Sequence, residues 1–341
     1  MDFRLSNDQC ALRAGMRELL AARFPREKLR AVVDCEDPAS RFDRALWSEL
    51  GKAGFFCLRL PEEDGGVGLG LPEAVLVFEE AGRAQLTGPL VATHLAAGLV
   101  PGAAEGTKVV TALDRPGMVE HLAVADVVLL LDGSTPRVLE ASGGRGPGLL
   151  AAQPVRSVDP TTPLHHVDRL AHDQGAEPVV GGVSATRLRG EAVLLTAAQQ
   201  LGSAVRTLEM AVAHAKNRTQ FGRPIGTFQA VQHLCAQMLV RTEIARSSVY
   251  AASLLITVSD IYGAKLLADE AAVRNARDCL QLHGGTGFTW DADVHPHLKR
   301  AWLRVEQWQP TAEAEEALAA ALLGVPENCS TEIANHPNGA V

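Results

Sequence analysis

Residues 218–229 read RTQFGRPIGTFQ, a polar break rich in glycine between two long segments with helical periodicity. Apolar residues recur at helical spacing from 194 to 218 before the break and from 229 to 258 after it. Arg218 offers a fixed positive fork that suits phosphate oxygens. The break leads into the N-terminus of a helix, where free backbone N–H groups favour anions. The stretch therefore predicts either an anion site or a solvated corner between two packed helices.

Residues 281–288 read QLHGGTGF and close a third helical segment, 264–283. Consecutive glycines lack Cβ atoms and let another molecule approach the backbone closely, but glycine is also the usual residue at a helix C-cap. A last alanine-rich segment, 311–324, completes a set of four helices. The C-terminal part of the chain is therefore expected to form a four-helix bundle.

The first hundred residues also read as helices. Apolar residues recur from Ser6, a plausible N-cap, to about Phe24, and again over 43–53, 72–84 and 91–100. Between about 107 and 190 the pattern changes to short runs such as VVTAL, DVVLLL and RVLEA, separated by glycine- and proline-containing turns. The fold class expected is mainly α, with a small β segment in the middle.

This reading divides the chain into four parts. We expect an N-terminal helical domain at 1–106, a shortened β middle domain at 107–190, the helical bundle at 191–325 and a flexible tail at 326–341.

Charge and composition exclude several classes of protein. The formal net charge is −8 and no long basic run is present, which argues against a nucleic-acid partner. The polar start MDFRLSNDQ is unlike a signal peptide, and the apolar run VVLLL is too short to cross a membrane. The six cysteines are scattered without CxxC pairs, which is typical of reduced thiols. We expect a cytoplasmic protein that binds neither nucleic acid nor membrane.

Taken together, the two motifs resemble the acyl-CoA dehydrogenase family. The stretches HAKNRTQFGRPIGTFQAVQHLCAQM and QLHGGTGFTWDADVHPHLKRA look like that family's two C-terminal signature regions. The opening MDFRLSNDQ and the loop PEEDGGVGLG resemble its N-terminal domain. The resemblance implies FAD as cofactor, an acyl-CoA thioester as substrate and an electron-transfer flavoprotein as electron acceptor.

The resemblance also implies roles for individual residues. In the family, the arginine motif grips the FAD pyrophosphate and the glutamine–glycine motif holds the adenosine end, on flavin seated in the neighbouring subunit. Arg218 would accordingly bind the pyrophosphate. The other residues implied to hold the nucleotide are Gln220, Phe221, Phe228, Gln229, Gln281, Gly284 and Gly285.

The chain departs from the family pattern at the catalytic base. The family's reaction needs a carboxylate within reach of the substrate's α-proton. Gln309 stands where one family glutamate would fall, and Ala192 stands at the other family position. Glu191 is one residue away, which turns a helical side chain by about 100°. Glu191 is therefore a weak candidate base, with a surface glutamate near the helix start as the alternative.

The middle segment also lacks the family's flavin-cradling stretches, and RSVDPTTPLHHVD there resembles the shortened subunits of actinobacterial steroid-degradation dehydrogenases. The hypothesis is a subunit of a heterotetramer whose larger partner binds most of the FAD and supplies the base. Two alternatives stay open: a self-sufficient homomeric dehydrogenase with Glu191 as base, and a non-catalytic structural partner. Asp291, Asp293, His295 and His297 alternate as on a strand, but no metal is expected there.

Overall fold

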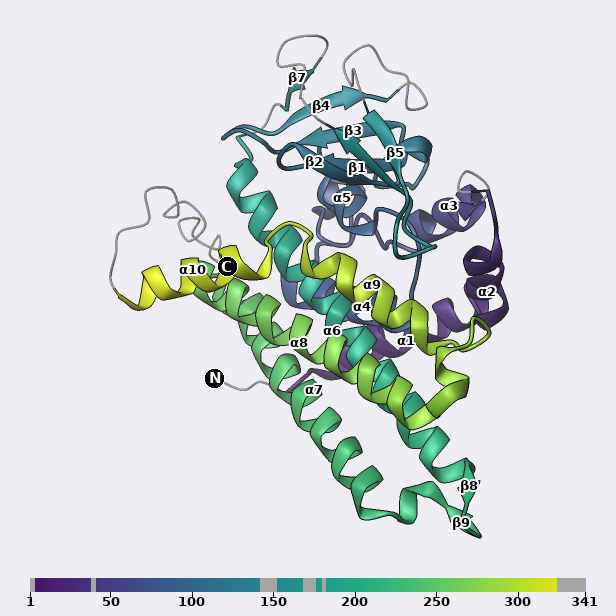
Figure 1. Ribbon diagram of the computed structural model, residues 1–341. Coiled ribbons are helices and arrows are strands. Elements are labelled where there is room, and N and C mark those ends of the chain that lie inside the picture. Colours follow the sequence, from purple (N-terminus) through teal and green to yellow (C-terminus); the bar gives the residue numbers. More distant parts are fainter. Residues whose placement is uncertain (1–3, 38–40, 142–151, 168–175, 180–181, 324–341) are drawn as a thin grey trace. The chain divides into compact units, whose positions relative to one another are not determined.

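The computed structural model describes residues 4–37, 41–141, 152–167, 176–179 and 182–323 (Figure 1). Helices dominate these residues, and short strands are gathered in the middle of the chain. The α-helices are α1 (Asn7–Arg23), α2 (Arg26–Asp34), α3 (Arg44–Lys52), α4 (Leu71–Arg83), α5 (Leu90–Leu95), α6 (Ala185–Asn217), α7 (Gln229–Leu255), α8 (Val258–His283), α9 (Val294–Val305) and α10 (Thr311–Leu322).

Short 3-10 helices and strands connect these helices. The 3-10 helices are η2 (Glu62–Asp64), η3 (Leu122–Val124), η4 (Ile225–Thr227) and η5 (Gly284–Phe288). The strands are β1 (Val110–Leu113), β2 (Gly117–Glu120), β3 (Val127–Leu130), β4 (Arg137–Glu140), β5 (Ala152–Val155), β6 (Leu164–Val167), β7 (Glu177–Pro178), β8 (Thr219–Gln220) and β9 (Arg223–Pro224).

Backbone contacts divide the described chain into two compact units. The helical unit gathers Met1–Pro25, Val75–Leu86 and Val193–Pro326, and the β-containing unit gathers Arg26–Ala74 and Thr87–Ala192. The N-terminal helices thus contribute to both units, and α4 and α6 each run from one unit into the other. The predicted division into four parts stays a prediction, and the predicted tail at 326–341 lies outside the described residues.

Two glycines bring α4 and α6 into backbone contact in the helical unit. A Cβ on Gly82 would lie 2.0 Å from the carbonyl oxygen of Gln199, and a Cβ on Gly202 would lie 1.9 Å from that of Glu79. Contacts this short are impossible for a side chain, so only glycine permits this approach. The reciprocal arrangement fixes where the two helices cross.

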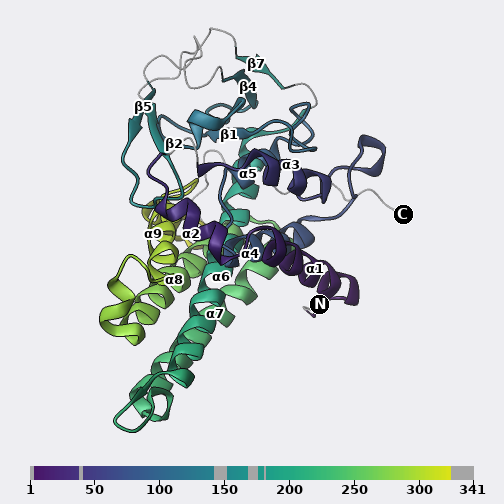
Figure 2. The same cartoon turned by 90° about the vertical axis from the view of Figure 1, so that its right-hand side faces the viewer.

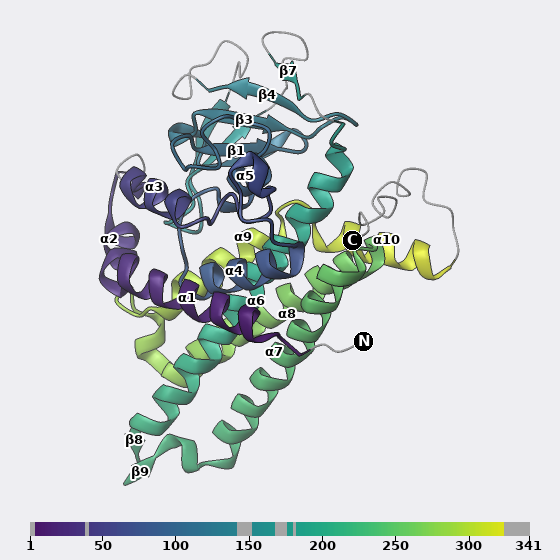
Figure 3. The same ribbon diagram turned by 180° about the vertical axis from the view of Figure 1, so that it is seen from behind.

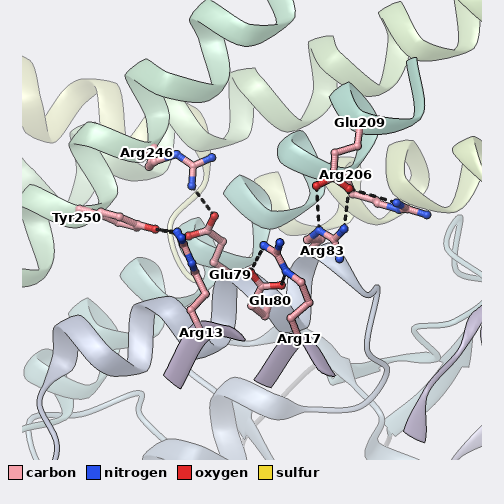
Figure 4. A network of polar contacts seen from close by, with 9 residues as sticks. All are labelled: Arg13, Arg17, Glu79, Glu80, Arg83, Arg206, Glu209, Arg246 and Tyr250. Carbon is pink, nitrogen blue, oxygen red and sulfur yellow. Dashed lines mark hydrogen bonds and ion pairs between the residues drawn. The ribbon is translucent and has the colours of Figure 1, made fainter. Parts of the chain in front are cut away.

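The crossing places two buried carboxylates of α4 between neighbouring helices (Figure 4). Glu79 accepts hydrogen bonds from Arg246 Nη1 at 2.8 Å and from the Tyr250 hydroxyl at 2.6 Å, both on α7. Glu80 accepts two from Arg17 on α1, at 2.6 and 2.9 Å. In Figure 3, α1 runs beside α4 and its N-terminal end approaches α7, in agreement with these contacts. Each buried charge is therefore neutralised by a residue from another helix.

The β-containing unit holds two small sheets. One has the order β1-β3-β4-β7, in which β1 and β3 are parallel, and the other has the antiparallel order β2-β6-β5. Strand β3 is buried along its whole length, as expected for a strand covered on both faces. Val128 and Leu130 of β3 belong to one core cluster together with Leu113, Val119, Leu122 and Val167.

The predicted fold class is confirmed: the chain is mostly helical, with a small middle sheet region and a C-terminal helical bundle. The predicted cap at Ser6 is present as a full capping box with Gln9. One expectation is wrong. Residues 294–305 form helix α9, although the alternation around His295 suggested a strand, because Pro296 occupies the first helical turn, where a missing N–H costs nothing.

We predict that Gly202→Ala destabilises the protein by more than about 3 kcal/mol, because the new Cβ meets backbone that cannot move aside. The matched control is Gly15→Ala on α1, whose Cβ meets no described atom within 4 Å and which gains helix propensity. Urea unfolding followed by far-UV circular dichroism measures both. Equal stability of the two variants would contradict the glycine crossing.

Candidate functional site

The break between α6 and α7 is a two-residue β-hairpin. Strands β8 and β9 pair antiparallel, with Gln220 opposite Arg223, and the turn residues Phe221 and Gly222 have φ of 53° and 76°. Positive φ at both central positions is typical of a type I′ turn. The hairpin base is held by a hydrogen bond from Ile225 N–H to the Arg218 carbonyl at 2.8 Å. The buried Ile225 side chain fixes the hairpin to the helical unit.

Most predicted nucleotide-binding side chains of this hairpin point away from the chain. Arg218, Gln220 and Gln229 are exposed, and Phe221 is 91% exposed. Phe228 is half-buried and packs edge-to-face with Phe221 at 6.1 Å between ring centroids. The Phe221 ring therefore gains little from this chain's own core, contrary to the simple helix-corner interpretation.

The twin-glycine segment follows α8 directly. Gly284 has a φ of 63° and caps the helix, since its N–H contacts the carbonyls of Leu280 and Gln281. A Cβ on Gly284 or on Gly285 would meet no described atom within 4 Å. Gly284 therefore has a conformational reason to be glycine, whereas nothing in the described packing requires Gly285 to lack a Cβ. An open glycine backbone of this kind fits the close approach of another molecule.

The two motifs lie at the same end of the bundle (Figures 1 and 2). His214, in the last turn of α6, stacks on His283, the last residue of α8, with ring centroids 4.0 Å apart. Arg218 follows His214 by one helical turn, and Gln281 precedes His283 by two residues. The structure thus brings together motifs that are about fifty residues apart in the chain. His214 was not among the predicted site residues, although it precedes Arg218 by four residues, the spacing of one helical turn.

Glu191, the weak candidate base, lies in a buried ion pair within the β-containing unit. Arg59 binds its two carboxylate oxygens at 2.6 and 3.0 Å, and Arg187 adds a contact at 3.0 Å. Burial alone would raise the pKa of Glu191, but the hydrogen bond and charge of Arg59, and then Arg187, outweigh it and lower that pKa. A carboxylate held this way has less tendency to accept a proton than an ordinary glutamate.

The second base position is occupied by an amide. Gln309 follows Trp308, which has a φ of 63°, an unusual value for a bulky residue. Gln309 donates its backbone N–H to the Gln307 carbonyl at 2.7 Å, and its side chain is half-buried just before α10. An amide side chain cannot act as a general base at neutral pH.

The described residues contain no group of three or more His, Cys, Asp or Glu side chains placed to hold a metal ion. Asp293 and His297 in particular lie at the start of α9, where His297 is buried against Ser203 and Gln85. No helix in the described part of the chain is long and apolar enough to cross a lipid bilayer.

The fold and both motifs are those of the acyl-CoA dehydrogenases, and the chain belongs to this family. Residues 6–110 match the family's N-terminal domain and residues 182–308 its C-terminal domain. FAD, the predicted cofactor, is the cofactor of this family, and the open hairpin and twin-glycine segment fit an elongated anionic nucleotide.

Two mycobacterial proteins are among the relatives of this chain. Acyl-CoA dehydrogenase IpdE2 of Mycolicibacterium smegmatis is 33% identical over 312 residues, which cover 87% of this chain and 93% of IpdE2. Acyl-CoA dehydrogenase FadE34 of Mycobacterium tuberculosis is 34% identical over 289 residues, which cover 76% of this chain but only 39% of FadE34. Among solved structures, a variant of the Tcur3481-Tcur3483 steroid ACAD superposes with a TM-score of 0.79 at 25% identity, covering 93% of this chain and 98% of that one.

We predict that Glu191→Gln lowers the free energy of unfolding by about 3–5 kcal/mol at neutral pH, because it leaves the Arg59 charge buried without its counter-ion. Since the pKa of Glu191 is lowered by folding, its stabilisation is present above the unfolded-state pKa and is lost as pH falls through the folded-state value. The loss in the variant should therefore shrink as pH falls below about 4. Urea unfolding midpoints of the parent and the variant, measured at several pH values, test this expectation.

A double variant provides the control for this ion pair. Replacing both partners, Arg59→Met with Glu191→Leu, removes both charges together and should cost less than Glu191→Gln alone. If Glu191→Gln is neutral, or its effect does not change with pH, the ion pair does not stabilise the fold as described.

Proposed function

We propose that this chain is the smaller subunit of a heteromeric, FAD-dependent acyl-CoA dehydrogenase. It would hold the adenine and pyrophosphate end of FAD that a larger partner binds at the flavin end. The observation that carries the proposal is the outward-facing half-site, in which Arg218, Gln281 and the open glycines 284–285 are brought together by the His214–His283 stack. Exposed residues in this arrangement are accessible to a ligand held mainly by another polypeptide.

The individual residues fit the parts of the nucleotide. Arg218 supplies a planar guanidinium for the pyrophosphate. Phe221 and Phe228 offer ring faces and edges for flat parts of the nucleotide, and Gln220, Gln229 and Gln281 offer amide donors and acceptors for its ribose and adenine. Gly284 and Gly285 let the nucleotide approach the backbone. When bound, FAD would supply the hydride acceptor of the α,β-dehydrogenation.

The base is assigned to the partner for two reasons of chemistry. Gln309 is neutral, and the Glu191 carboxylate is engaged by Arg59 and Arg187. Proton abstraction next to a thioester carbonyl requires a free carboxylate within reach. The reading in which Glu191 is the base of a self-sufficient enzyme would require both arginines to release it.

Two observations support a second polypeptide. Val240, Ile244, Leu254 and Leu255 of α7 are all 46–56% exposed, and their helical spacing places them along one stripe. Large aliphatic side chains exposed on one side of a helix suit a surface that another polypeptide covers. The match leaves 61% of FadE34 uncovered (100 minus 39). This length is enough for a second subunit-sized segment, of comparable or larger size, within the FadE34 chain.

The substrate proposed is the CoA thioester of a bulky acyl group, such as a steroid side chain. The solved structure described as a steroid ACAD supports this class, as does the short middle segment in which the described strands have two to four residues each. A heterotetramer of two small and two large subunits in the cytoplasm, with an electron-transfer flavoprotein as acceptor, completes the proposal.

We predict that Arg218→Ala sharply lowers the flavin content of the complex purified after co-expression with a larger dehydrogenase subunit, since one charged phosphate contact is lost. The matched control is Arg274→Ala on α8, an exposed arginine that pairs only with Glu270 four residues earlier among the contacts described. Flavin absorbance per mole of protein measures the flavin content of both variants. Unchanged flavin content and turnover in Arg218→Ala would refute the half-site.

The number of flavins per polypeptide distinguishes the proposed heteromeric enzyme from a self-sufficient homomeric one. The complex should contain about half a flavin per polypeptide, and this chain purified by itself should be colourless because it holds only one end of the cofactor. A yellow, active homo-oligomer formed by this chain alone would instead support the self-sufficient enzyme.

A further inference from the structure

Two histidines join the arginine hairpin to the twin-glycine segment. The rings of His214 and His283 are nearly parallel, with planes 26° apart and centroids 4.0 Å apart. Ala211, Cys279 and Leu280 belong to the core cluster at this end of α6 and α8. Two phenyl rings could fill the same space, so packing alone does not require groups that titrate near neutral pH.

The two rings have defined surroundings. His283 Nδ1 lies 2.8 Å from the Cys279 carbonyl, and because a carbonyl only accepts, this nitrogen donates the hydrogen bond. The groups that act on His214 are His283 on α8 and Arg218, which directly follows the end of α6. Burial first, then the charges of His283 and Arg218, lower the pKa of His214 below its ordinary value.

An anion bound at Arg218 would reverse this electrostatic effect. Arg218 donates its backbone N–H to the His214 carbonyl at 2.8 Å, so the two residues are separated by a single helical turn. A pyrophosphate held by the Arg218 side chain neutralises the positive charge that opposes protonation of His214. Proton uptake by His214 and anion binding are then coupled, and each strengthens the other.

We propose that His214 and His283 are a positioning pair for the nucleotide: their stack sets the spacing between Arg218 and Gly284–Gly285, and His214 takes up a proton from solvent when the pyrophosphate binds. This inference rests on the proposed nucleotide half-site. Its consequence is a nucleotide affinity that rises as pH falls, with His214 as the responsible group.

The test uses the full chain and ADP-ribose, whose pyrophosphate diester is the one found in FAD and keeps its charge across the range used. Affinity measured by NMR titration should be at least about fivefold tighter at about pH 6 than at about pH 8. The imidazole resonance of His214 should titrate at higher pH once ADP-ribose is present. If the parent chain gives no shift with ADP-ribose, both the inference and the half-site are wrong.

Variants separate stacking from proton uptake. His214→Phe keeps a stacked ring and should bind with the same affinity at both pH values, whereas His214→Ala should weaken binding at both. His166→Ala on β6, a histidine outside the helical unit, is the matched control and should behave as the parent. If His214→Phe keeps the parent's pH dependence, the inference is wrong. If Arg218→Ala binds as the parent does, the proposed function fails instead.

Discussion

The helical unit depends on the contact between α4 and α6 at Gly82 and Gly202. Because neither residue has a Cβ, the two backbones meet at a distance that no other residue pair allows. The crossing fixes the position of Glu79 and Glu80, whose buried carboxylates then determine where Arg246, Tyr250 and Arg17 must lie. Burial and the charge of Glu79 raise the pKa of Tyr250, so the hydroxyl stays protonated and donates. The two glycines thus determine where α1 and α7 contact α4.

Long periodic helices and short apolar strands were predictable from the sequence because both patterns are local. Ser6 caps α1, and the runs at β1, β3 and β4 form strands, because neighbouring residues decide these outcomes. Helix α9 was missed although Val294, His297, Leu298 and Ala301 carry its buried spacing, because charged and polar residues alternate through its first turn. The hairpin at 219–224 was missed as well, because a phenylalanine rarely takes the positive φ that its turn requires.

The resemblance in sequence identified the residues of the candidate site, but it did not predict how they are arranged in space. The Arg59–Glu191 pair joins residues 132 positions apart, and no periodicity links them. The stack of His214 on His283 likewise depends on how α6 and α8 pack, which a single sequence does not express. Both pairs bear on the proposed function, since one engages the glutamate next to a family base position and the other joins the two motifs of the proposed half-site.

The exposed half-site and the ion-paired Glu191 both favour an active site that is shared between this chain and a partner. A complete active site needs a cavity that excludes water, because charge stabilisation and proton transfer weaken in bulk solvent. Phe221 at 91% exposed and Phe288 at 73% lie instead on the outside of the described chain, where apolar rings cost free energy until something covers them. A partner that seats the flavin end of FAD would cover them and supply the free carboxylate that Gln309 and the ion-paired Glu191 do not offer. Selection on this chain would then preserve its nucleotide contacts and its packing while leaving the base positions free to change.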